Sequence, residues 1–206
     1  MQIIDLTHTF TEDMPVFPGD PKPSLTQTAH ITENTFNDHT LTTVMHVGTH
    51  MDAPLHMIAG GKTIDALSVE KFVGRGIVLD VRGKEIIDSS VLEGVEIPTE
   101  SIVLLYTGYG EKYRSSDYFR SAPVIAEDFA RIMIEHNVKG LGMDISGPDA
   151  DDPWIVHKIL LTNEIYILEN LTNLDQLLSY DSFEVVALPI KLKSDGAPVR
   201  VIAKVG

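Results

Sequence analysis

The segment HVGTHMDAPLH, residues 46–56, restricts the fold of this chain more than any other part of the sequence. Its three histidines and its aspartate all have even numbers, and alternate residues of a β-strand share one face. These residues are His46, His50, Asp52 and His56. An extended chain would separate His46 from His50 by about 13 Å, near the limit for two side chains that bind one ion. The segment therefore predicts a strand that bends between these two histidines.

Gly48 offers that bend, because a glycine within a strand pattern is typical of a bulge or a close backbone approach. His50 and Asp52 are two residues apart and can reach one ion without distortion, and Pro54 ends the strand pairing. Two imidazoles and one carboxylate suit zinc, manganese or iron and leave positions open for water and substrate. An open position indicates catalysis. In the competing interpretation these side chains only form hydrogen bonds on a strand surface, which explains one such histidine better than four polar residues at this spacing.

The composition of the 206-residue chain is that of a globular protein, with 43% hydrophobic and 22% charged residues. We expect one domain over residues 1–206. The formal net charge of -14 repels phosphate backbones and anionic lipids, so neither nucleic acid nor a membrane is an expected partner. No cysteine is present, so any metal must be bound through nitrogen and oxygen. The N-terminus does not have the pattern of a signal peptide, and we expect a soluble, cytoplasmic protein.

Secondary-structure patterns predict a β-rich first part and a layered α/β remainder. The expected strands are residues 2–6, 24–31, 40–47, 76–81, 101–106, 140–145, 164–168, 183–192 and 199–205. Helices are expected over residues 126–136 and from about residue 153. Apolar runs such as SIVLLY, residues 101–106, are typical of buried strands.

The motif in residues 46–56 resembles the HxGTHxDxPxH signature of a cyclase family of metal-dependent hydrolases, and it matches every fixed position. This family includes bacterial kynurenine formamidases, which are arylformamidases, and isatin hydrolases. PVFPGDP, ILENL and GAPVRVIA are also similar to family segments, so the resemblance covers most of the chain. It implies a swivelling β/β/α domain, in which helices surround a barrel-like mixed sheet. It also implies a homo-oligomer, either a dimer or a tetramer.

The resemblance implies that a distal histidine and glutamate complete the metal site, and these map onto His157 and Glu169. One ion would be bound by His46, His50 and Asp52. A second would be bound by Asp52, His157 and Glu169, so that Asp52 bridges the two. Zinc is the expected metal, with one or two ions per chain, and manganese is the alternative. By spacing alone, His157 as a helix-face residue and Glu169 as a surface carboxylate explain the sequence equally well.

His56 is the catalytic acid–base in this interpretation, because imidazole can take a proton from water and return it to a leaving amine. The alternative roles of His56 are a fourth metal ligand or a residue that contacts the metal ligands without binding the metal. Phe17 in PVFPGDP is expected to stack on an aromatic substrate, with core packing as the alternative. Asp144, after a buried strand, is expected to orient a ligand histidine. Arg200 is the one cationic residue that we consider as a ligand for a carboxylate of the substrate.

The function implied is hydrolysis of an amide C–N bond by a metal-bound hydroxide. The first expectation is an arylformamidase that converts N-formylkynurenine and water into kynurenine and formate, in tryptophan catabolism. Hydrolysis of a cyclic amide such as isatin is the alternative, and the motif does not separate the two. No Gly-x-Ser-x-Gly elbow is present, which disfavours a serine hydrolase.

Two further classes remain open at the level of sequence. A non-haem iron oxygenase also uses two histidines and one carboxylate, but the additional His157 and Glu169 disfavour it. A purely structural metal site would be closed by four protein ligands, and His56 beside an open site disfavours that arrangement.

Overall fold

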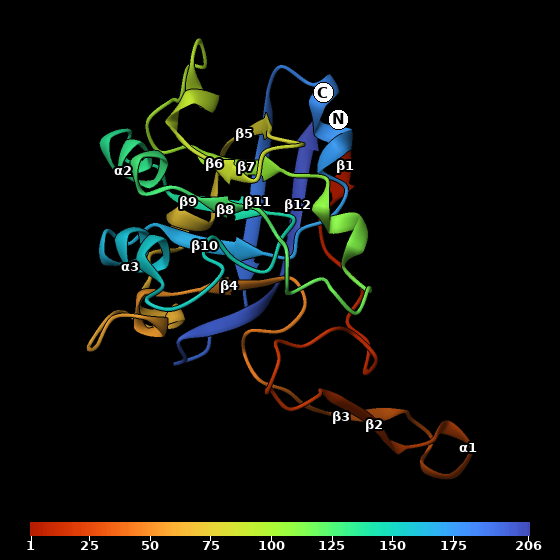
Figure 1. The fold of residues 1–206 in the computed structure, drawn as a ribbon. Helices are drawn as coiled ribbons and strands as arrows, with labels where there is room; N and C mark the ends of the chain where they lie inside the picture. Colours follow the sequence, from red (N-terminus) through yellow and green to blue (C-terminus); the bar gives the residue numbers. More distant parts are fainter.

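A closed β-barrel is the centre of the fold in the computed structural model, which describes all residues 1–206 (Figure 1). The sheet has the order β1-β12-β11-β5-β7-β9-β10-β4, and β4 also pairs with β12, so the seven strands from β12 to β4 form a ring. Its strands are β1 Gln2–Asp5, β4 His50–Asp52, β5 Val73–Asp80, β7 Ile102–Tyr106, β9 Gly140–Met143, β10 Tyr166–Glu169, β11 Phe183–Pro189 and β12 Gly196–Val205. Strands β5, β7, β9 and β10 are parallel neighbours, and the other pairings are antiparallel.

The alternation of side chains along the strands produces two hydrophobic cores. In β7, Leu104 belongs to a core that faces the barrel interior, while Val103 and Leu105 belong to a second core on the opposite face. This second core includes Phe129 of α2 (Glu127–Glu135) and Leu160 of α3 (Ile155–Thr162). Both helices therefore cover the same side of the barrel (Figure 1).

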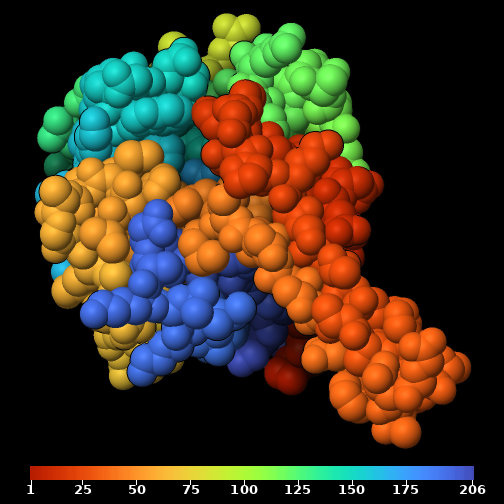
Figure 2. Space-filling view, turned by 90° about the horizontal axis from the view of Figure 1, so that it is seen from below, coloured from red at the N-terminus to blue at the C-terminus, as the bar shows by residue number.

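Smaller elements lie outside the barrel. They are β2 Ser24–Ala29, α1 Ile31–Asn34 and β3 Asp38–Thr42, which form an arm, and the pair β6 Ile86–Ile87 and β8 Val124–Ile125. The arm projects away from the body of the molecule (Figure 2). None of the helices is long and apolar enough to cross a membrane.

The predicted α/β fold with a barrel-like mixed sheet is confirmed, and so are most of the predicted elements. The strand predicted over residues 40–47 is wrong beyond Thr42, where β3 ends. Residues 43–49 form no strand but bend around Gly48, which has a φ of 64°. His46 and His50 therefore do not share a strand. The motif strand β4 contains only residues 50–52.

Candidate metal centre

A cavity of about 660 Å³ opens beside β4, and the predicted ligands line it together. It contains every residue that the sequence analysis selected for metal binding and acid–base catalysis: His46, His50, Asp52, His56, His157 and Glu169. These residues come from four separate parts of the fold, namely the bend before β4, β4 with the turn after it, α3 and β10. The barrel therefore gathers residues that are up to 123 positions apart in the chain.

Strand pairing places the buried carboxylates and imidazoles against one another. The antiparallel register of β4 and β10 sets His50 directly opposite Glu169, which is the last residue of β10. His50 Nε2 lies 3.5 Å from Glu169 Oε2 and 3.3 Å from Asp52 Oδ1. His157 enters from α3, with its Nε2 3.3 Å from Glu169 Oε1.

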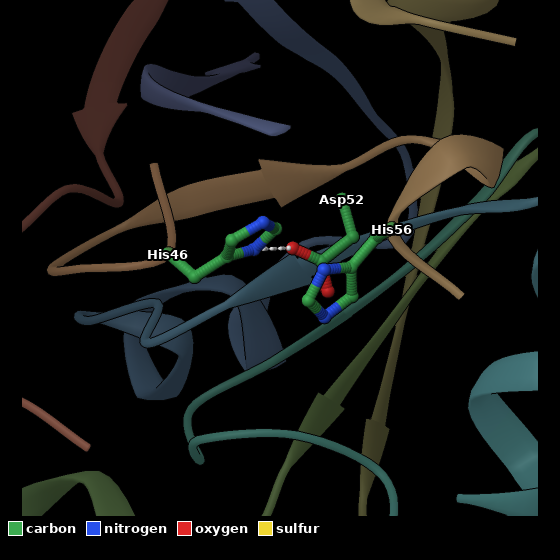
Figure 3. A group of neighbouring side chains, drawn as sticks. All are labelled: His46, Asp52 and His56. Atoms are coloured by element: carbon green, nitrogen blue, oxygen red, sulfur yellow. Dashed lines mark hydrogen bonds and ion pairs between the residues drawn. The ribbon is translucent and has the colours of Figure 1, made fainter. Parts of the chain in front are cut away.

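His46 reaches the same site through the bend at Gly48 and not along a strand. Its ring centroid lies 5.2 Å from that of His50, and its Nδ1 lies 2.7 Å from Asp52 Oδ1 (Figure 3). Its ring packs directly on the backbone of Gly196, where an added Cβ would lie 2.6 Å from His46 Cε1. The bend that the sequence required is thus present, but it precedes the strand.

His56 lies at the end of a 3₁₀ turn, Pro54–His56, which returns the chain over the motif. Its ring stacks on His46 at a centroid distance of 3.8 Å, close to Asp52 (Figure 3). Potential ligand atoms gather into two groups, one of His46, Asp52 and His56 and the other of His50, Asp52 and Glu169. Asp52 belongs to both groups.

The chemistry of Asp52 fits a bound cation. Its side chain is only 1% exposed, and its Oδ2 is buried without any hydrogen-bond partner. That oxygen lies 4.0 Å from His157 Nε2, while Oδ1 faces His46 and His50. Burial raises the pKa of Asp52, but hydrogen bonds from His46 and His50 outweigh burial and hold it well below its usual range. A buried, unpartnered anionic oxygen is costly, and a metal ion would compensate for it.

His46, His50 and His157 each donate a hydrogen bond through the ring nitrogen that points away from this centre. His50 Nδ1 donates to the carbonyl of Gly48 at 2.8 Å. His157 Nδ1 donates to Asp149 Oδ2 at 2.7 Å, and His46 Nε2 donates to Asp195 Oδ2 at 3.0 Å. Such bonds fix the ring orientation of a metal ligand.

Asp149 and Asp195 were not found from the sequence. The expectation that Asp144 orients a histidine is wrong, because its carboxylate instead accepts hydrogen bonds from Thr107 and from the Gly108 backbone. Asp149 offered a signal, since it lies eight residues before His157 and also accepts from the backbone N–H groups that begin α3. Asp195 offered none, because it is 149 residues from His46 in the sequence.

Aromatic side chains form the outer wall of the cavity. Phe17, 42% exposed, lies edge-on to Phe119 at 5.8 Å and to Trp154 at 6.3 Å. No lysine or arginine lines the cavity, and Arg200 pairs with Asp5 outside it, so the expectation noted for Arg200 is wrong. The cavity thus combines an aromatic wall with a buried acidic and imidazole floor.

A buried polar chain behind the site holds the bend in place. Tyr118 Oη donates to Asn170 Oδ1 at 2.7 Å, and Asn170 Nδ2 donates to the carbonyl of Gly48 at 2.9 Å. The same carbonyl accepts from His50 Nδ1. Asn170 directly follows Glu169, so these hydrogen bonds connect the end of β10 to the ring orientation of His50.

The Asn170→Asp variant is expected to lose about 2 to 4 kcal/mol of unfolding free energy, because a buried carboxylate would face the Gly48 carbonyl in place of an N–H donor. Urea unfolding of the metal-free protein measures this loss. The exposed Asn163→Asp variant is the matched control and should lose less than about 1 kcal/mol. An equal loss in both variants would show that the buried hydrogen bonds of Asn170 do not stabilise the bend.

Comparison with known proteins finds a matching family, relatives in sequence and similar solved structures. The family described as "Putative cyclase" matches residues 4–150. A kynurenine formamidase from Bacillus mycoides (strain KBAB4) is 31% identical, and the match covers 98% of this chain and 97% of that protein. Isatin hydrolase A from Labrenzia aggregata, bound to benzyl benzoate, has a TM-score of 0.89 at 28% identity, covering 99% and 93% of the two chains. A structure described as a potential metal-dependent hydrolase with cyclase activity has a TM-score of 0.83 at 29% identity, covering 98% and 96%.

Proposed function

Because the chain belongs to this cyclase family and is a hydrolase of amide bonds, we propose that it is an arylformamidase that hydrolyses N-formylkynurenine to kynurenine and formate. The observation that carries the proposal is the full-length relationship to kynurenine formamidases, together with a cavity that gathers three histidines, two carboxylates and His56. The aromatic wall around Phe17 suits an aryl amide.

We propose the two ligand sets that the family resemblance implies, and the distances select the ligand atom of each residue. By convergence alone, His56 groups with His46 and Asp52, and Glu169 groups with His50 and Asp52. His46 Nδ1, His50 Nε2 and Asp52 Oδ1 form the first set. Asp52 Oδ2, His157 Nε2 and Glu169 Oε1 form the second set. Zinc is the proposed metal and manganese the alternative, since both accept imidazole and carboxylate ligands. The bound metal supplies polarisation of the amide carbonyl and activation of water.

A side chain of the protein then transfers the proton. Burial lowers the pKa of His56, so its ring is neutral near pH 7 and can accept a proton from the attacking water. Water oxygen bonds to the formyl carbon, the C–N bond breaks, and the proton passes from His56 to the departing aryl amine. Kynurenine and formate are the products, and the second proton of the water passes to solvent when the formic acid ionises. Phe17, Phe119 and Trp154 hold the aryl ring at the cavity entrance.

Metal binding is expected to release protons at pH 7 and to strengthen as the pH rises. Burial opposes protonation of His46 and His157, but hydrogen bonds to carboxylates outweigh it and raise their pKa values to about 9 and about 10. Each ring therefore holds at pH 7 a proton that a cation must displace. For each displaced proton, the metal affinity should fall about tenfold for every unit by which the pH is lowered.

Calorimetry in two buffers of different ionisation enthalpy counts these protons. The Asp149→Asn variant should release fewer, because the hydrogen bond from His157 to Asp149 is the largest contribution that raises the pKa of His157. Zinc binding at pH 7 without proton release would contradict the assignment of these two ligands.

The function is tested by the absorbance of kynurenine released from N-formylkynurenine by zinc-loaded, manganese-loaded and chelator-treated protein. Metal-dependent turnover supports the proposal. The fold similarity to isatin hydrolase A favours a second candidate, hydrolysis of the cyclic amide isatin, which the same preparations test in parallel. Turnover of isatin alone would move the substrate assignment to cyclic amides.

The homo-oligomeric state and the cytoplasmic location stay predictions. Sedimentation velocity tests the oligomeric state.

A further inference from the structure

Asp195 lies between two histidine rings that have different proposed roles. Its Oδ2 accepts a hydrogen bond from His46 Nε2 at 3.0 Å and lies 3.6 Å from His56 Nδ1. Because the two rings stack at 3.8 Å, their outward nitrogens face the same carboxylate. Asp149, in contrast, accepts a hydrogen bond from only one histidine ring, that of His157.

The backbone holds Asp195 in this position. Its carbonyl accepts a hydrogen bond from Ala53 N at 2.8 Å, within the motif segment. The next residue, Gly196, begins β12 and pairs with Asp52. The backbone of Asp195 is therefore fixed beside β4, while its side chain, which lines the cavity, is 41% exposed.

We propose that Asp195 is a positioning residue for amide hydrolysis, which holds the proton of His56 on Nδ1 and leaves Nε2 free for the reacting groups. This inference rests on the arylformamidase function proposed above. The Nδ1 atom of His56 faces Asp195, so an N–H at that atom has an acceptor. A carboxylate that fixes one tautomer of a catalytic imidazole makes every turnover start with the correct nitrogen unprotonated.

The position of Asp195 disfavours a role as a metal ligand. It approaches His46 through Nε2, whereas Asp52 approaches through Nδ1, so the His46 ring lies between Asp195 and Asp52. Asp195 also belongs to neither group of converging ligand atoms. Its effect on catalysis should therefore pass through the imidazole rings.

A double-mutant cycle tests the route of this effect. Asp195→Asn should lower kcat for N-formylkynurenine by about 10- to 100-fold, with KM changed less than about threefold. In the His56→Ala background the same substitution should lower kcat by a clearly smaller factor, because only the contact of Asp195 with His46 remains. The matched control is Asp149→Asn, which should lower kcat by a similar factor in both backgrounds. Equal effects of Asp195→Asn in both backgrounds would overturn the proposal.

Nitrogen chemical shifts of the His56 ring test the same inference without activity. Zinc-loaded wild-type protein should show the proton on Nδ1. In Asp195→Asn the amide can donate to Nδ1, and the proton should move at least partly to Nε2. A wild-type ring with its proton on Nε2 would overturn the proposal. Because the shifts do not depend on turnover, a failure of the arylformamidase assignment and a failure of this inference give different results.

Discussion

The Asp52→Asn variant is expected to lose at least about a thousandfold of kcat/KM for amide hydrolysis. Asp52 is the one residue shared by both groups of converging ligand atoms, and its two oxygens face different histidines. Asparagine keeps the size of the side chain but replaces one oxygen by an NH₂ group that cannot bind a cation. Loss of metal-based charge stabilisation removes several kcal/mol, and about 4 kcal/mol corresponds to about a thousandfold in rate.

Metal analysis should accompany the kinetics. The variant is expected to retain less than half of the wild-type zinc after dialysis (roughly one ligand set lost of two), while circular dichroism shows an unchanged fold. Asp20→Asn is the matched control, because Asp20 lines the same cavity but is exposed and belongs to neither ligand group. A variant that keeps both its zinc and its rate would show that Asp52 is not a metal ligand.

The sequence predicted those parts of the site that depend on local spacing. His50 and Asp52 lie two residues apart on β4, and alternation along a strand is enough to bring them together. The apolar runs that become β5, β7 and β9 were recognisable because strands buried on both faces contain few polar residues. Local pattern was sufficient in each of these cases.

Features that depend on contacts between distant segments could not be predicted in this way. The barrel closes through the pairing of β4 with β12, residues that are more than 140 positions apart, and no local pattern encodes that register. The same closure brings Asp195 to His46. The error over the 40–47 strand has a similar origin, since the alternating residues that suggested pairing have no partner strand beyond Thr42.

His56→Ala is expected to lower kcat by about 10²- to 10⁴-fold while leaving the zinc content unchanged. The ring is partly exposed to the cavity, so its removal should cost little stability. Its place next to both His46 and Asp52 makes the zinc measurement decisive, because these three side chains also form a possible ligand group. The matched control is His39→Ala, which removes an exposed histidine from the projecting arm and should leave kcat within about twofold.

The two measurements separate the possible roles of this ring. An acid–base residue can be removed without loss of metal, since it carries protons between water and the leaving amine, whereas a fourth ligand cannot. Loss of zinc together with activity in His56→Ala would therefore contradict the acid–base role and make His56 a metal ligand. Retained zinc with a low kcat would show that the other residues of the site hold the cation without His56. The half-buried ring beside Asp195 would then be the group that moves the proton.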